Sequence, residues 1–151
     1  MEDALYKLAQ IVYDMNFNGI PIVFSWPIGS GFIDLVLNYE HDREKASASR
    51  LQFLQLLDDL RSHANISKIC IISHSMGSQL VLDALVSDQQ QKIKLSELVF
   101  AAPDIDRDVF INLADRLKSS AKGITLYASH ADRALFLSGA VARGPRAGDV
   151  Q

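Results

Sequence analysis

Four short runs along the chain are almost continuously apolar, and polar stretches separate them. We predict strands over residues 21–26, 68–73, 97–101 and 124–128. Runs of this length and composition are typical of strands that are buried on both faces of a parallel sheet.

Between these runs, apolar residues recur three and four positions apart, which is the spacing of one face of a helix. This pattern predicts helices over about 4–15, 44–63, 80–85 and 109–117. Helices and strands therefore alternate along the whole chain. Such alternation implies right-handed crossovers and an α/β fold, with a mostly parallel sheet covered by helices on both faces. We find no repeat or linker and expect residues 1–151 to form a single domain.

The composition of the chain argues against several classes of function. The chain has 151 residues, of which 48% are hydrophobic and 22% charged, and its net charge of −3 argues against a nucleic-acid partner. No apolar stretch approaches the roughly 18 residues that span a bilayer, and the N-terminus does not resemble a signal peptide, so we expect a cytoplasmic protein. Cys70 is the only cysteine, which leaves no internal disulfide.

The strongest chemical signal follows the second predicted strand, where the chain reads Ser73-His74-Ser75-Met76-Gly77 before an apolar helix. This resembles the nucleophile elbow G-x-S-x-G, a turn so tight that the residues two before and two after the nucleophile must be small. Ser73 stands where glycine is usual. The motif indicates Ser75 as the nucleophile and the Met76 N–H as an oxyanion-hole donor. The alternative, which we consider weaker, is a polar turn without catalytic function.

A serine nucleophile needs a carboxylate that orients its base, and in this architecture it follows the serine in the chain. Asp132, in the loop after the last predicted strand, is our first candidate, although capping of a short helix explains it about equally well. Asp104 is the second choice. For Asp104 and Asp106 we favour helix capping, because both precede the helix over 109–117.

The general base is the weakest part of this prediction. The four histidines are His41, His63, His74 and His130, and none of them follows Asp132. His130 has an outside chance of being the base, since it lies at the correct edge of the predicted sheet. We predict neither a metal nor a cofactor, because no cluster of ligands has metal-binding spacing. The absence of a G-x-G-x-x-G or Walker sequence makes nucleotide binding a weak alternative.

Taken together, residues 19–27, 73–77, 101–106 and 127–135 resemble a little-characterised bacterial family of α/β-hydrolases. The resemblance covers essentially the whole chain. It implies an esterase- or lipase-like serine hydrolase acting on small-molecule esters, with Ser75 as nucleophile and Asp132 as triad acid. A catalytically inactive product that binds an acyl ligand or a partner protein is the alternative.

The resemblance also implies that the fold is incomplete. Family members begin earlier, with a strand and a loop that donates the second oxyanion N–H, and they end later, with a final strand and the catalytic histidine. Without the N-terminal strand, the strands over 21–26 and 68–73 would pair directly or leave unpaired edges. Because unpaired edges are prone to association, we expect marginal stability and consider an oligomer feasible.

Overall fold

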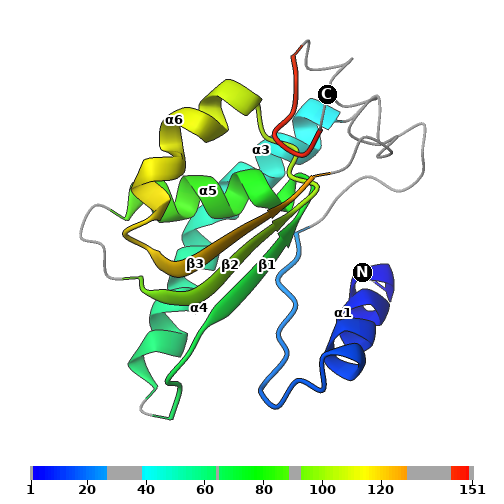
Figure 1. The fold of residues 1–151 in the computed structure, drawn as a ribbon, viewed down its shortest axis with the longest axis vertical. Helices are drawn as coiled ribbons and strands as arrows, with labels where there is room; N and C mark the ends of the chain where they lie inside the picture. The colour runs from blue at the N-terminus through cyan, green and yellow to red at the C-terminus, as the bar shows by residue number, and fades with distance from the viewer. Residues whose placement is uncertain (1, 27–38, 64, 89–92, 129–143, 150–151) are drawn as a thin grey trace.

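The computed structural model describes residues 2–26, 39–63, 65–88, 93–128 and 144–149 (Figure 1). Along the chain its elements are α1 (Glu2–Asp14), α3 (Tyr39–Ala48), α4 (Arg50–Ser62), β1 (Cys70–His74), α5 (Gly77–Ser87), β2 (Leu95–Ala101), α6 (Arg107–Leu117) and β3 (Ala121–Tyr127). The strand predictions over 68–73, 97–101 and 124–128 correspond to β1, β2 and β3. The α/β alternation read from the sequence is therefore confirmed.

The three strands form one parallel sheet in the order β1-β2-β3. Ile72 of β1 lies opposite Val99 of β2, which in turn lies opposite Thr125 of β3. Parallel pairing brings the carboxyl ends of all three strands to one edge of the sheet, where ligands bind in folds of this kind. Ser75 and Asp104 both lie in loops that leave this edge.

The strand predicted over 21–26 is not formed. This segment is extended, but it has no paired strand among the described residues, and its side chains hold it in place instead. The rings of Phe24 and Phe53 meet edge to face with their centroids 5.1 Å apart, and Trp26 also packs against the hydrophobic core. An apolar run can thus be anchored by aromatic side chains without any ladder of backbone hydrogen bonds.

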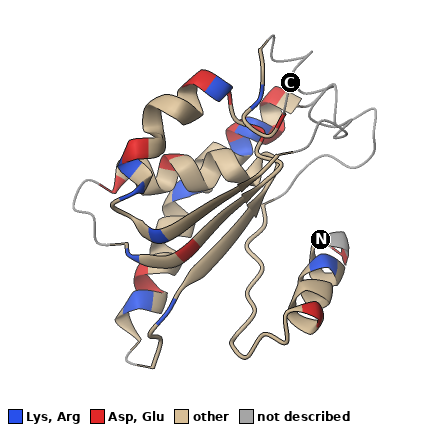
Figure 2. Ribbon diagram, in the orientation of Figure 1, with Lys and Arg blue, Asp and Glu red and all other residues tan. Residues whose placement is uncertain are grey.

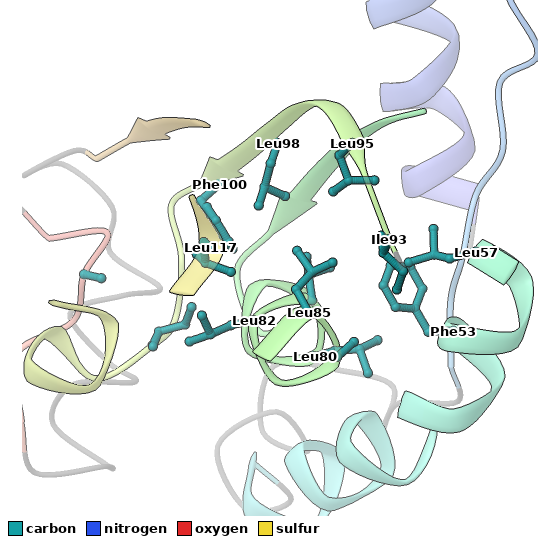
Figure 3. Close-up of a cluster of buried hydrophobic side chains, with 14 residues drawn as sticks. Phe53, Leu57, Leu80, Leu82, Leu85, Ile93, Leu95, Leu98, Phe100 and Leu117 are labelled. Carbon is teal, nitrogen blue, oxygen red and sulfur yellow. The ribbon is translucent and has the colours of Figure 1, made fainter. Parts of the chain in front are cut away.

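The hydrophobic core lies between the sheet and the helices α4, α5 and α6. Leu98 and Phe100 of β2 point toward α5, which returns Leu82 and Leu85 to the sheet (Figure 3). All four of these residues are at most 3% exposed. Helix α5 is covered nearly all round because α3, α4 and α6 pack beside it. The run from β1 through α5 to β2 is therefore the best-packed part of the molecule.

Among the described residues, the helices that pack on the sheet lie on one of its faces. Phe110 of α6 meets Phe100 edge to face at 5.4 Å, which places α6 in the same layer as α4 and α5. On the opposite face, Ile72 is 50% and Tyr127 64% exposed. Figure 1 shows α1 at the side of the sheet. Met15, the residue that follows α1, is 67% exposed.

The single helix expected over 44–63 is also wrong, because the structure divides this region into α3 and α4 at Ser49. The Ser49 hydroxyl donates to the carbonyl oxygen of Lys45 at 2.9 Å. A side chain that bonds the carbonyl four residues earlier competes with the helical backbone and bends the helix. The Ser49 carbonyl still accepts from the N–H of Phe53 at 3.0 Å, so α4 starts at once after the bend.

Charged residues are concentrated on the helices, and the three strands carry few of them (Figure 2). Glu97 and Lys122 are examples on β2 and β3, and both are exposed. Within the ranges that the structure describes, no helix is long and apolar enough to cross a membrane.

Because the core lies on one face of the sheet, we expect truncation of two apolar residues on adjacent strands to lower the free energy of unfolding by different amounts. Leu98→Ala removes a fully buried side chain from beneath α5 and should lower the free energy of unfolding by about 2 to 5 kcal/mol. Ile72→Ala, on the open face, should cost about 1 kcal/mol or less. Urea unfolding of both variants followed by circular dichroism checks this, and equal losses would contradict a core confined to one face.

Candidate active site

Ser75 occupies the turn between β1, which ends at His74, and α5, which begins at Gly77. Its backbone φ is 50°, in the left-handed region that residues with a side chain rarely adopt. Strain of this kind persists only where the surrounding structure imposes it, and it is concentrated at functional sites. The strand, tight turn and helix predicted around Ser75 are thus all present.

The small residues on either side of Ser75 have structural reasons to be small. A Cβ atom at Gly77 would lie 3.3 Å from the ring of Trp26, so the close approach of that ring favours glycine. Ser73, which replaces the usual glycine, is buried and donates to the Val99 carbonyl oxygen at 3.1 Å. The buried Ser78 hydroxyl donates in turn to Ser73 Oγ at 3.2 Å. Ser73 therefore adds a hydrogen bond between β1 and β2.

The loop after β2 holds the backbone of Ser75 on both sides. The Ser75 N–H donates to the Ala101 carbonyl oxygen at 3.1 Å, and the Asp104 N–H donates to the Ser75 carbonyl oxygen at 3.2 Å. Between them, Ala102 has a φ of 44°, a second left-handed residue without glycine's freedom. Its N–H donates to the Tyr127 carbonyl oxygen at 2.8 Å. Backbone hydrogen bonds with neighbouring strands and loops therefore restrain both left-handed residues at the carboxyl edge of the sheet.

Two polar groups of the turn have no hydrogen-bond partner among the described residues, namely Ser75 Oγ and the Met76 N–H. Both lie at the N-terminus of α5, where the helix dipole places positive potential. The first turn of α5 contains no acidic side chain that would offset this potential. A hydroxyl beside an unused N–H and a helix N-terminus is an arrangement that can hold a carbonyl oxygen as it becomes negative.

Asp104 belongs to a buried cluster with two residues that the sequence analysis did not identify. Tyr39 Oη donates to Asp104 Oδ2 at 2.8 Å, and Arg146 Nε lies 3.0 Å from Asp104 Oδ1 in an ion pair. Arg146 Nη2 also donates to Tyr39 Oη at 3.1 Å. The three residues are 3–6% exposed. The sequence held no signal for this cluster, because the burial of Arg146 and its pairing with Asp104 depend on the fold.

Segment 144–149, which carries Arg146, is fastened to the loop after β2 by its backbone. The N–H groups of Ala147 and Gly148 donate to the carbonyl oxygens of Ile105 and Pro103, at 2.8 Å and 3.0 Å. Figure 1 shows this segment next to the start of α3, which contributes Tyr39, at the carboxyl edge of the sheet. Three regions far apart in the sequence therefore meet behind Ser75.

The capping prediction is confirmed for Asp106 and wrong for Asp104. Asp106 Oδ1 accepts from the N–H groups of Asp108 and Val109 at 3.0 Å and 3.1 Å, as an N-cap of α6 does. The Asp104 side chain lies in the interior instead, where it forms an ion pair with Arg146 and accepts a hydrogen bond from the Tyr39 hydroxyl.

The described histidines have partners or positions away from Ser75 Oγ. His41 pairs with Glu44 at 3.8 Å, and His63 Nδ1 lies 2.6 Å from the Asp59 carbonyl oxygen. His74 follows the inward-pointing Ser73 on β1, so its exposed side chain lies on the open face of the sheet. Asp132 and His130, the predicted acid and outside-chance base, lie outside the described residues.

A small cavity of about 170 Å³ lies beside the turn, between α3 and α5. Met76 forms part of its wall, with apolar Ala46 and Leu80 and polar Arg43 and Gln79 among the other residues. Over the part of the chain that is described, no group of three or more His, Cys, Asp and Glu side chains could hold a metal ion.

Comparison with known proteins identifies the family. A family model described as an alpha/beta hydrolase of unknown function (DUF900) matches residues 1–151. The chain belongs to this family. A search of curated proteins and a search of solved structures found no match. Membership confirms the family resemblance inferred from the motifs, and it confirms the α/β-hydrolase type of the fold. The family description names a hydrolase but no specific reaction.

The buried cluster predicts how stability depends on alkaline pH. Burial, followed by the neighbouring Asp104 carboxylate, raises the pKa of Tyr39 from its ordinary 10 to about 12. Between these values the unfolded chain releases the phenol proton while the folded chain retains it, so stability falls as pH rises. The loss should reach about 2 kcal/mol at pH 12.

Tyr39→Phe has no phenol proton at this position and serves as the comparison. We expect the difference in unfolding free energy between the wild-type chain and this variant to shrink as pH rises from 10 to 12. Urea unfolding at four pH values in this range measures it. Two pH profiles that run parallel would contradict a raised pKa at Tyr39.

Proposed function

We propose that the protein is a serine hydrolase that acts on small carboxylic esters through an acyl-enzyme at Ser75. The observation that carries this proposal is the left-handed backbone of Ser75 in a turn between a parallel strand and a helix, with its hydroxyl unbonded among the described residues. Membership of an α/β-hydrolase family supports the same interpretation. The strained turn raises Oγ above the sheet edge, where a substrate carbonyl can approach.

In the proposed reaction, Ser75 Oγ attacks the ester carbonyl carbon and the carbonyl oxygen becomes negative. The Met76 N–H and the N-terminus of α5 stabilise that oxygen. A histidine accepts the hydroxyl proton and returns it to the leaving alcohol, after which water releases the acid from Ser75. Of the four histidines in the chain, His130 is the outside candidate for this role.

Asp132 remains the preferred acid of the triad, and the surroundings of Asp104 support this choice. Both Asp104 oxygens are engaged inside the protein, one by Arg146 and the other by Tyr39. Reorienting this carboxylate toward an imidazole would leave the buried Arg146 guanidinium without its counter-ion, which is costly. Asp104 is therefore the less suitable partner for a base.

The cavity beside Met76 favours a small substrate group. Its volume of about 170 Å³ is below the range of roughly 300–1,000 Å³ that is typical of sites for larger ligands. Arg43, Gln79 and Asp83 give part of its wall polar and charged character, which suits a short acyl or alcohol group better than a long alkyl chain. We accordingly propose short-chain esters as the substrate class.

The proposal predicts covalent labelling at one serine. A fluorophosphonate probe should label the wild-type chain at Ser75, and Ser75→Ala should abolish labelling and reduce any p-nitrophenyl butyrate hydrolysis at least about a thousandfold. Mass spectrometry of the labelled peptide identifies the site. Ser62→Ala, which changes an exposed serine on α4, is the matched control and should label normally.

An acyl-binding protein without turnover is the second candidate. It is favoured by one observation, that none of the histidines at 41, 63 and 74 is bonded to Ser75 among the described residues. A chain that leaves the probe and p-nitrophenyl butyrate unreacted, yet binds a short-chain carboxylic acid in calorimetry, would support this candidate over the hydrolase.

A further inference from the structure

The cluster of Tyr39, Asp104 and Arg146 lies directly behind the turn that carries Ser75. Asp104 links the cluster to the turn. Its N–H donates to the Ser75 carbonyl oxygen at 3.2 Å, and its carboxylate pairs with Arg146 and accepts a hydrogen bond from Tyr39. No other described residue joins the strained turn to the buried charges in this way. The side chain of Arg146 thus pairs with the carboxylate of the same residue whose backbone N–H is bonded to Ser75.

We infer that Arg146 is a positioning residue for the nucleophile, acting through Asp104 on the backbone of Ser75. This inference rests on the function proposed above. Arginine suits the task because its guanidinium forms an ion pair with Asp104, with Nε 3.0 Å from Oδ1, while Nη2 donates a hydrogen bond to Tyr39. A lysine would present a single charged point and could not hold both partners in a fixed geometry.

Stability alone is a weak explanation for this cluster. A buried ion pair generally stabilises a fold no better than apolar side chains of similar volume, since both charges lose their hydration. The cluster instead helps to hold the loop after β2 in one position against segment 144–149 and α3. The backbone needs that restraint at Ser75 and Ala102, which both have left-handed φ values.

Charge gives the arginine a second effect on the site. Asp104 is close enough to bond the backbone of Ser75, so an uncompensated carboxylate there would oppose negative charge on the substrate oxygen. Arg146, at 3.0 Å from this carboxylate, offsets its charge. The positive potential at the N-terminus of α5 is then available to the oxyanion.

The test compares Arg146→Lys, Arg146→Met and the apolar double variant Asp104→Leu/Arg146→Met with the wild-type chain. Arg107→Met, which alters an exposed arginine at the start of α6, is the matched control. For each variant, urea unfolding reports stability, and fluorophosphonate labelling at several probe concentrations separates the limiting rate from the apparent affinity. Amide hydrogen exchange at Ser75, whose N–H is bonded to the Ala101 carbonyl oxygen, reports the order of the turn without requiring any reactivity.

We expect the limiting rate of labelling to fall by about ten- to a hundredfold in both Arg146 variants, with less loss for lysine, while the apparent affinity for the probe stays unchanged. Exchange at Ser75 should quicken in parallel. The double variant should regain stability but still label slowly. Arg107→Met should match the wild-type chain throughout.

A stable double variant that labels at the wild-type rate, with unchanged exchange at Ser75, would overturn the inference and leave the cluster a purely structural role. If the Arg146 variants do not fold, Tyr39→Phe, which removes one hydroxyl, is the remaining probe, and unchanged exchange in it would count equally against the inference. If wild-type Ser75 does not react at all, the proposed function fails, whereas the exchange data still decide whether Arg146 orders the turn.

Discussion

The parallel pairing of β1 with β2 is the constraint on which the site depends. Ser73 lies opposite Phe100 in this register, and the two strands therefore end side by side, with Ser75 just past one end and Asp104 just past the other. The α5 crossover reinforces the pairing, because it packs Leu82 and Leu85 against the buried side of β2. A shift of register by one residue would move Phe100 out of the core and separate the two loops.

Strain and restraint are balanced along this edge. Ser75 and Ala102 each adopt a left-handed backbone, which costs on the order of 1–2 kcal/mol for a residue with a side chain. Hydrogen bonds from neighbouring strands and loops offset that cost, among them the bond from Ala102 N–H to the Tyr127 carbonyl oxygen. The well-packed core beneath them makes the restraint firm. The open opposite face contributes nothing comparable, as the exposure of Ile72 indicates.

The sequence was most informative where local pattern and tertiary structure agree. Apolar runs identified three strands, and the small residues around Ser75 identified the turn, since both signals depend on neighbours in the chain. The run over 21–26 misled us, because apolar composition indicates burial and not a partner for the backbone. Tyr39 and Arg146 were missed for a related reason. They meet over 107 positions, and no spacing rule connects residues that far apart.

Asp104 illustrates how the surroundings of a carboxylate determine its role. Its position after a strand, following the serine, made it a candidate for the triad, and by sequence alone it differs little from Asp132. The fold then encloses it between a guanidinium and a phenol, both buried. A triad acid must bond an imidazole whose charge changes during the reaction. A carboxylate already paired with a permanent cation gains less from that change, so Asp104 is better suited to holding the turn than to orienting a base.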